Sequence, residues 1–167
     1  DGTKMYVNSY VNNDVKEYDL STPYNISTAS YVNNFVMTTQ EGNPFGLAFN
    51  ADGSKMYTIG DFNNTVYEYN LATPFSVSTA TVSGNTFLVT EDGSVRALTF
   101  GKSGSKMYLV GDQNNSVFEY DLYPAYDITS GTLSDSFVIS EDVSPYDVAF
   151  NTLNNKMFVI GQATSTL

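Results

Sequence analysis

The tripeptide Lys-Met-aromatic recurs four times in this chain at an almost constant spacing. It begins at Lys4, Lys55, Lys106 and Lys156, so the steps are 51, 51 and 50 residues. A fixed period of this size indicates a repeat architecture, in which each repeat is one supersecondary unit that cannot bury its own faces alone. This period constrains the fold more than any other property of the sequence.

One repeat contains four short apolar runs separated by polar segments. In the second repeat these runs lie at 44–49, 55–59, 66–69 and 87–90, and β-branched and aromatic residues dominate them. Asp52-Gly53 between the first two runs is a hairpin signal, because such a turn needs a positive φ. Nothing shows sustained helical periodicity. The sequence therefore predicts an all-β fold, a β-propeller with four-stranded antiparallel blades.

Within a blade we call the strands inner, second, third and outer, counted from the propeller axis in chain order. These names can be assigned along the whole chain. Inner strands are expected near 45–49, 95–100 and 146–150, and third strands at 15–18, 66–69 and 117–120. Outer strands are expected near 35–38, 87–90 and 137–140. The chain thus starts and ends in a second strand. We expect residues 1–167 to be a single propeller repeat region of about three blades, with a partial blade at each end.

About three blades are too few to close a ring, since propellers typically have four to eight. Unclosed end blades would expose apolar faces. We expect the ring to be completed either by more repeats on a longer polypeptide or by another copy of the chain. Two copies would make six blades, but each chain has four second strands and three strands of each other type. That mismatch favours the longer polypeptide.

The charge balance excludes several classes of partner. The chain has 18 acidic and 7 basic residues, a net charge of −11. Phosphate contacts need clustered Lys and Arg, so we do not expect nucleic-acid binding. No segment approaches the roughly 18 apolar residues of a membrane span, so membrane insertion is not expected either. The absence of Cys excludes disulfides and thiolate chemistry.

Two kinds of residue recur on the strands. Each third strand carries a Glu at the same place, namely Glu17, Glu68 and Glu119. We expect each to pair with a Lys of the neighbouring second strand, namely Lys4, Lys55 and Lys106, because opposite charges across a sheet are common stabilisers. The alternative is a ring of carboxylate ligands. The Met residues of the tripeptides are expected in the core between blades.

Two sets of loops are rich in oxygen atoms that could bind a ligand. The loops after the second strands contain Asp61, Asn63, Asn64, Asp112, Asn114 and Asn115, and the loops before the inner strands contain Glu91, Asp92, Glu141 and Asp142. Because strands alternate in direction, both sets emerge on the same face of a propeller. Such a rim could hold Ca²⁺, which takes six to eight oxygen ligands, or bind a glycan or protein surface. Asn and Asp are also ordinary turn residues.

Catalysis is not expected, and neither is a cofactor. The chain has no His and no Cys, so the usual general base and thiol nucleophile are missing. A carboxylate pair such as Glu91 and Glu141 could support glycoside hydrolysis, but repetition alone explains both. Arg96 is the only Arg and breaks the repeat. We expect it to form a local ion pair or, alternatively, an anion contact near the central channel.

The repeat resembles a known family. Asp52-Gly53-Ser54-Lys55-Met56-Tyr57, followed by the segments at 63–71 and 73–80, is similar to a bacterial and phage β-propeller repeat. That repeat usually reads Asp-Gly-Thr-Lys-Met-Tyr-Val, then Val-x-Glu-Tyr-Asp-Leu-Ser-Thr, then Trp/Tyr-Asp-Ile/Val-Ser-Thr-Ala, and it is distantly related to YVTN-type propellers. The resemblance covers nearly all of the chain. Tyr24, Phe75 and Tyr126 stand where Trp is common.

Repeats of this kind occur in large surface proteins and in predicted virion proteins of marine phages. The resemblance implies a non-enzymatic binding or structural module located outside the cell, on a cell surface or in a virion. It implies a protein or glycan surface partner, and no catalytic residue can be carried over. Two alternatives stay open, namely a glycan-active enzyme or lectin-like accessory domain, and a purely architectural component of an assembly.

Overall fold

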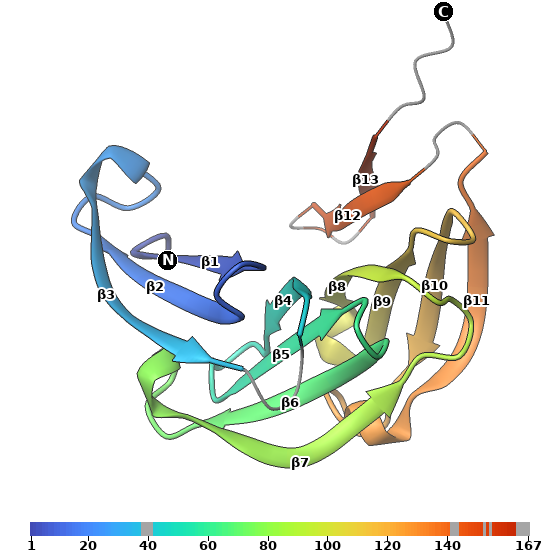
Figure 1. Ribbon diagram of the computed structural model, residues 1–167, viewed down its shortest axis with the longest axis horizontal. Helices are drawn as coiled ribbons and strands as arrows, with labels where there is room; N and C mark the ends of the chain where they lie inside the picture. The colour runs from blue at the N-terminus through green and yellow to red at the C-terminus, as the bar shows by residue number, and fades with distance from the viewer. Residues whose placement is uncertain (38–41, 141–143, 152, 154, 163–167) are drawn as a thin grey trace, which may run out of the picture.

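The chain folds into antiparallel sheets that follow one another along an arc (Figure 1). This computed structural model describes residues 1–37, 42–140, 144–151, 153 and 155–162. We call the sheets blades 1 to 4 in chain order. Each is joined to the next through the outer strand of one blade and the inner strand of the following blade, as expected for a propeller.

The strands of each blade lie side by side in chain order. Blade 1 comprises β1 (Lys4–Ser9), β2 (Asp14–Leu20) and β3 (Ala29–Val36). Blade 2 comprises β4 (Pro44–Phe49), β5 (Lys55–Gly60), β6 (Thr65–Leu71) and β7 (Ala80–Leu88). Blade 3 comprises β8 (Val95–Gly101), β9 (Lys106–Gly111), β10 (Ser116–Asp121) and β11 (Thr132–Val138). Blade 4 comprises β12 (Pro145–Phe150) and β13 (Met157–Gly161).

Short 3-10 helices accompany these strands. A single turn precedes each outer strand, at η1 (Ile26–Thr28), η2 (Val77–Thr79) and η4 (Ile128–Ser130). A further turn, η3 (Lys102–Gly104), lies in the β8–β9 connection. In the part of the chain that the structure describes, no helix is long and apolar enough to cross a membrane.

The predicted fold and its phase are confirmed. Blades 2 and 3 are four-stranded and antiparallel, and blade 1 holds a second, a third and an outer strand. Blade 4 holds an inner and a second strand among the described residues. The chain is therefore a partial β-propeller that begins and ends on second strands, as the repeat phase predicts.

The predicted bounds of the outer strands were wrong. The structure places these strands several residues earlier, at β3, β7 and β11, and Val89 and Thr90 lie beyond the end of β7. The reason is exposure, since most of β7 and all of β11 face solvent and carry no apolar alternation. Gly84, at φ +90°, accompanies a register irregularity between β6 and β7, which further obscures the strand pattern.

The Asp-Gly turn before the second strand has a positive φ, as predicted. Gly53 has φ +72°, and a Cβ there would come within 2.2 Å of the Phe75 ring. Phe75 itself has φ +61° and donates a backbone hydrogen bond of 2.9 Å to the Gly53 carbonyl. Gly2 with Tyr24, and Gly104 with Tyr126, repeat this arrangement. The aromatic residue at this position of each repeat therefore packs over the glycine turn, and we call it the aromatic lid.

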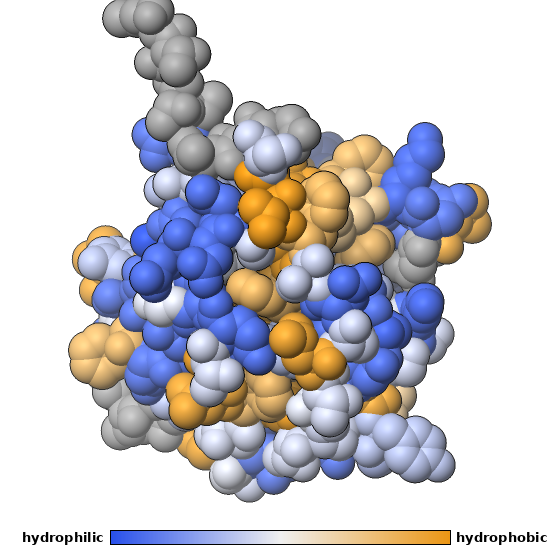
Figure 2. All heavy atoms as spheres, turned by 90° about the vertical axis from the view of Figure 1, so that its right-hand side faces the viewer, coloured by the Kyte–Doolittle hydropathy of each residue, from blue (hydrophilic) through white to orange (hydrophobic). Residues whose placement is uncertain are grey.

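Burial of the repeated Met residues depends on the blade. Met56 and Met107 are fully buried, which confirms the core prediction for the complete blades. Met5 is half-buried and Met157 is exposed, so for blade 4 the prediction was wrong. The end blades lack a neighbouring blade on one side. Figure 2 shows apolar side chains reaching the surface on the side of the molecule that faces right in Figure 1.

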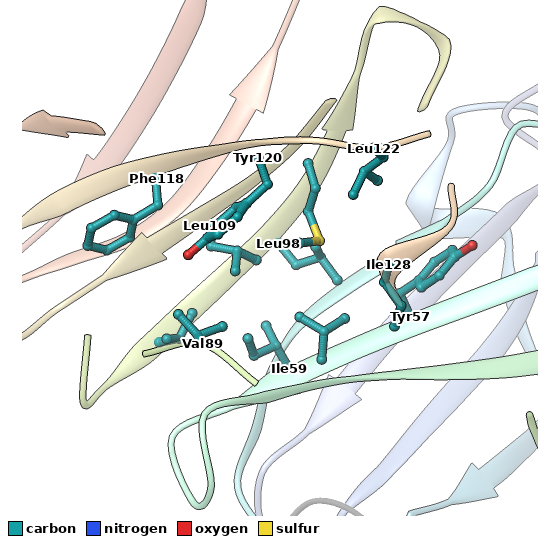
Figure 3. Close-up of a cluster of buried hydrophobic side chains, with 12 residues drawn as sticks. Tyr57, Ile59, Val89, Leu98, Leu109, Phe118, Tyr120, Leu122 and Ile128 are labelled. Carbon is teal, nitrogen blue, oxygen red and sulfur yellow. The ribbon is translucent and has the colours of Figure 1, made fainter. Parts of the chain in front are cut away.

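The main core lies between blades rather than within them. Tyr57 and Ile59 of β5 meet Leu98 of β8, Leu109 of β9 and Ile128 of η4 in one buried cluster (Figure 3). A second cluster joins blade 1 to blade 2 in the same way. Because each sheet covers the next, the position of one blade fixes the loops of its neighbour at the central axis.

Candidate functional site

Equivalent positions on the three inner strands converge near the axis of the propeller. Phe45 of β4, Arg96 of β8 and Tyr146 of β12 each stand second in their strand. The guanidinium carbon of Arg96 lies 4.4 Å from the centre of the Phe45 ring and 5.8 Å from that of Tyr146. Cations over aromatic faces are attracted by the ring quadrupole. The single Arg thus lies between aromatic residues of two neighbouring blades.

Arg96 also forms two ion pairs. Its Nη1 lies 2.8 Å from an Asp61 carboxylate oxygen and its Nη2 lies 3.2 Å from an Asp112 carboxylate oxygen. The three side chains are between 17% and 20% exposed, so the pairs are largely shielded from water. Asp61 belongs to blade 2 and Asp112 to blade 3. The predicted local ion pair is therefore confirmed, and it joins two blades.

The equivalent positions also meet at the boundary of blades 1 and 2, but there the contact is aromatic instead of ionic. Tyr10 is the repeat equivalent of Asp61, and its ring stacks on Phe45 with centroids 5.7 Å apart. The loop residue after a second strand therefore meets the second residue of the next inner strand, whether the pair is aromatic or ionic. This equivalence explains why Asp61 and Arg96 occur together.

A pocket of about 370 Å³ opens beside this cluster. Tyr6, Asn8, Arg96, Tyr146 and Asp147 line it, with backbone and side chains of 45–47. The Asn8 amide nitrogen donates to the Gly46 carbonyl at 3.4 Å. Its buried Oδ1 accepts no hydrogen bond from the described residues. The pocket combines aromatic walls with polar groups at the axis.

Sequence reasoning missed most of these lining residues. Asn8 was not singled out, and Tyr6, Tyr146 and Asp147 appeared only as parts of predicted strands, not as site residues. The period itself carried a usable signal, because Phe45, Arg96 and Tyr146 are spaced by 51 and 50 residues on strands that line the axis. Asn8 gave no such signal, since its position in the pocket depends on the relative placement of blades 1 and 2.

The predicted rim residues Glu91 and Asp92 organise their own loops. Asp92 is buried and its carboxylate accepts backbone hydrogen bonds from Ser94 (2.7 Å) and Asn114 (2.8 Å). Glu91 accepts a hydrogen bond of 2.7 Å from the Tyr120 hydroxyl. Burial, followed by this hydrogen bond, raises the pKa of Tyr120. The Asn114 amide also donates to the Glu91 carbonyl, so the two predicted loop sets do meet in space.

The Asn residues of the rim connect blades. Asn64, at φ +50°, donates to the Gly93 carbonyl at 3.1 Å and accepts from the Val95 amide at 3.2 Å, which joins blade 2 to the entry of blade 3. Asn115 makes the equivalent contact to the Ser144 amide at 2.9 Å. Asn tolerates this left-handed conformation better than most residues. These side chains therefore have a structural role, whether or not the rim also binds a ligand.

Three predicted rim residues remain, namely Asn63, Glu141 and Asp142. Asn63 donates a 2.6 Å hydrogen bond to the Tyr67 hydroxyl within blade 2. Glu141 and Asp142 lie outside the described residues. Over the described ranges, no three acidic side chains gather closely enough to hold a metal ion, and the calcium site stays a prediction.

The repeated Glu and Lys residues pair as predicted. The Nζ–Oε distances are 2.5 Å for Lys4–Glu17, 2.9 Å for Lys55–Glu68 and 2.5 Å for Lys106–Glu119. Hydrogen bonds to Asp121 and Glu119 raise the pKa of Lys106. The carboxylates of Glu17 and Glu68 are 1% exposed and that of Glu119 is 29% exposed. Glu17 also accepts a 2.9 Å hydrogen bond from the Val77 amide of blade 2, so its carboxylate joins two blades. All three residues are thus structural in the described chain.

Comparison with known proteins supports the fold alone. No protein-family model matches the sequence, and no curated protein matches it either. The structure is similar to a protein of Bacteroides uniformis provisionally named a 6-phosphogluconolactonase, with a TM-score of 0.66 at 11% identity. It is also similar to a protein of Lactobacillus plantarum, with a TM-score of 0.62 at 12% identity, and to the hydrazine synthase of Kuenenia stuttgartiensis, with 0.64 at 13%.

The chain spans about half the length of these solved structures. It is covered over 97%, 94% and 99% of its own residues, against 48%, 47% and 41% of theirs. The likeness therefore concerns the blades and their succession around the axis. Neighbours at this identity show a shared propeller-type architecture and carry no activity over to this chain.

Proposed function

We propose that this chain is a non-enzymatic β-propeller module that binds or displays a partner on a bacterial surface or in a virion. One observation carries the proposal. Arg96, the only Arg of the chain, is paired with Asp61 and Asp112 from two blades. A catalytic group needs an unsatisfied charge or a perturbed acid-base pair facing substrate, and this cluster is occupied by internal partners.

The partner we propose is a glycan or a protein surface. The axial pocket offers the aromatic side chains of Tyr6 and Tyr146 and the amide of Asn8. Aromatic faces with a few convergent polar groups suit sugar rings and peptide side chains. The repeat resemblance supports a location outside the cell, on a cell surface or in a virion. The net charge of −11 supports solubility in such a medium and argues against nucleic acid as the partner.

A glycan array and a panel of surface polysaccharides test this proposal. The protein is expected to bind a defined subset, and Tyr146→Ala is expected to remove that binding. Tyr123→Ala is the matched control, because Tyr123 is 90% exposed and does not line the pocket. Equal binding by Tyr146→Ala and the wild type would exclude the axial pocket as the site.

A glycan- or lactone-hydrolysing enzyme is the second candidate. The names of two similar structures and the carboxylate of Glu91 at the rim favour testing it. A screen with aryl glycosides and sugar lactones, including 6-phosphogluconolactone, is expected to give no turnover above background. Turnover by the wild type that disappears in Glu91→Gln would overturn the non-enzymatic proposal.

A purely architectural role is the third candidate. It predicts that the chain assembles with itself or with other chains and that no ligand is found on the array. The contacts that repeat between blades indicate which surfaces such an assembly would use, so this candidate can be tested.

A further inference from the structure

The boundary between blades 1 and 2 and the boundary between blades 2 and 3 share the same contacts. The Tyr6 hydroxyl donates to the Phe75 carbonyl of the next blade at 2.5 Å, and the Tyr57 hydroxyl donates to the Tyr126 carbonyl at 2.9 Å. The donor stands in a second strand and the acceptor is the aromatic lid of the following glycine turn. One side of a blade thus carries hydroxyl donors, and the opposite side carries matching carbonyl acceptors.

Apolar contacts accompany these hydrogen bonds. Phe35 on the outer strand of blade 1 packs edge-to-face on Tyr69 of blade 2, with centroids 5.1 Å apart. Phe87 of blade 2 packs on Tyr120 of blade 3 in the same way, at 5.0 Å. The 3-10 turn of the later blade lies against the outer strand of the earlier one, as β3 with η2 and β7 with η4 show.

Blade 1 presents the acceptor side of this interface to solvent. Ile26 of η1 is 74% exposed, whereas its repeat equivalents Val77 and Ile128 are fully buried. Tyr24, the equivalent of Phe75 and Tyr126, is exposed as well. All three positions, 26, 77 and 128, carry an apolar β-branched residue. The difference in burial therefore reflects the neighbouring blade, which packs on Val77 and Ile128 but not on Ile26 in the described chain.

Blade 3 presents the donor side. Phe137 is 58% exposed, whereas its equivalents Phe35 and Phe87 are half-buried against the next blade. A groove beside it is lined by Tyr108, Glu119, Phe137 and Met157, among others. The Tyr108 hydroxyl forms a hydrogen bond with Glu119 of its own blade, and among the described residues it has no carbonyl acceptor in a following blade such as Tyr6 and Tyr57 have.

We propose that the acceptor side of blade 1 in a second copy of this chain docks on the donor side of blade 3. The Tyr108 hydroxyl then donates to the carbonyl of the second copy's Tyr24. Phe137 packs on the second copy's Tyr18, the equivalent of Tyr69 and Tyr120. Ile26 of the second copy becomes buried against β11. The interface is the one already formed twice within the chain, now formed between chains.

This docking completes blade 4. β12 supplies its inner strand, and β1, β2 and β3 of the second copy supply the second, third and outer strands. β1 takes the place of β13, since both are second strands, so the β12–β13 pairing of the single chain has to open as the two copies dock. Two such junctions close a two-chain ring of six blades.

Electrostatics opposes the association, so apolar burial and strand pairing must drive it. Each chain carries a net charge of −11, and the repulsion between two such chains is screened by salt. The complex is therefore expected to strengthen as the ionic strength rises. An interface made mainly of ion pairs would weaken instead.

Light scattering on the 167-residue chain after size-exclusion chromatography tests the proposal. At micromolar concentration we expect twice the mass of one chain, and more of this species at 0.5 M than at 0.05 M NaCl. Ile26→Asp is expected to give a folded species with the mass of one chain. Phe62→Asp is the matched control and keeps the double mass, since Phe62 is 70% exposed on a loop of blade 2 away from both sides. A wild type with the mass of one chain, or of more than two, overturns the two-chain ring.

A cross-link gives an independent readout of register. The chain has no Cys, so Tyr18→Cys combined with Phe137→Cys introduces the only thiols. Mild oxidation is expected to give a covalent dimer on a denaturing gel. The control pair, Phe62→Cys with Phe137→Cys, is expected to stay monomeric on the gel. A covalent dimer from both pairs, or from neither, contradicts the proposed register.

Discussion

The hydroxyl of Tyr57 donates a 2.9 Å hydrogen bond to the backbone carbonyl of Tyr126, 69 positions later and one blade further on. Tyr57 is fully buried, and burial, followed by the charge of Glu68, raises its pKa. A buried neutral phenol aimed at a carbonyl is a directional contact in an otherwise apolar interface. The repeated tyrosine of the Lys-Met-aromatic tripeptide therefore sets the position of the next blade.

Tyr57→Phe is expected to lower the free energy of unfolding by about 1–2 kcal/mol, because the Tyr126 carbonyl loses its donor while the ring stays in place. Urea denaturation measures this difference. Tyr123→Phe serves as the control and is expected to change nothing, since Tyr123 is 90% exposed. Equal stability of Tyr57→Phe and the wild type would show that the hydrogen bond contributes no net stability.

The tyrosines predict how stability depends on alkaline pH. Burial, followed by the charge of Glu17, raises the pKa of Tyr6 to about 12. Burial, followed by a hydrogen bond with Glu119, raises the pKa of Tyr108 to about 12. A raised folded-state pKa contributes stability that is complete below the unfolded value of about 10 and is lost as pH rises through the folded value. We therefore expect the protein to lose stability between pH 10 and 12.

Absorbance of phenolate near 295 nm, followed together with circular dichroism, checks this expectation. Tyr57 and Tyr120 are expected to ionise only as the sheets unfold, because burial raises the pKa of both. Titration of all the tyrosines in one step near pH 10, with the fold retained, would contradict the burial of these phenols.

The glycine turns before the second strands predict a graded effect of mutation. Gly53→Val is expected to lower the free energy of unfolding by about 2–4 kcal/mol, since it combines a positive φ with a clash against the Phe75 ring. Gly84→Val is the matched control. Gly84 also has a positive φ, but a Cβ there would meet nothing within 4 Å, so only strain of about 1–2 kcal/mol is expected. Thermal denaturation of both variants separates strain from clash, and equal losses would show that the ring makes room.

The repeat made the blades predictable because it appears in residues that pack locally. The Lys-Met-aromatic tripeptide located each second strand, and the Lys55–Glu68 pair followed from neighbouring strands in one sheet. The bounds of the outer strands were not predicted correctly because such strands lack an apolar pattern, as β11, which is exposed throughout, shows. Nor could the sequence distinguish Ile26 from Val77, since a neighbouring blade decides which of the two is buried.

The candidate site was harder to predict for the same reason. Asp61 and Asp112 were predicted as rim residues from composition, but their common partner Arg96 follows only from the packing of blade 2 against blade 3. The Asn64 contact with Gly93 likewise joins residues of two blades. Polar residues of the loops looked available for a ligand because one repeat, taken alone, does not show the hydrogen bonds that the next repeat supplies.

The Arg96 cluster gives the last prediction. Arg96→Met is expected to lower the free energy of unfolding by about 2–3 kcal/mol, because it leaves the carboxylates of Asp61 and Asp112 facing each other without a cation. Asp61→Asn alone is expected to cost less, about 1 kcal/mol, since Asp112 still pairs with the guanidinium. The double variant Arg96→Met/Asp61→Asn is expected to lose about 1 kcal/mol less unfolding free energy than the two single losses add up to. A double-mutant cycle in urea measures this difference. Lys16→Met with Asp14→Asn is the control cycle, because that ion pair lies within blade 1 and joins no blades. Strict additivity for Arg96 and Asp61 would show that the two side chains do not interact in solution. Blades 2 and 3 would then be held by apolar packing and by hydrogen bonds such as that from Tyr57 to the Tyr126 carbonyl.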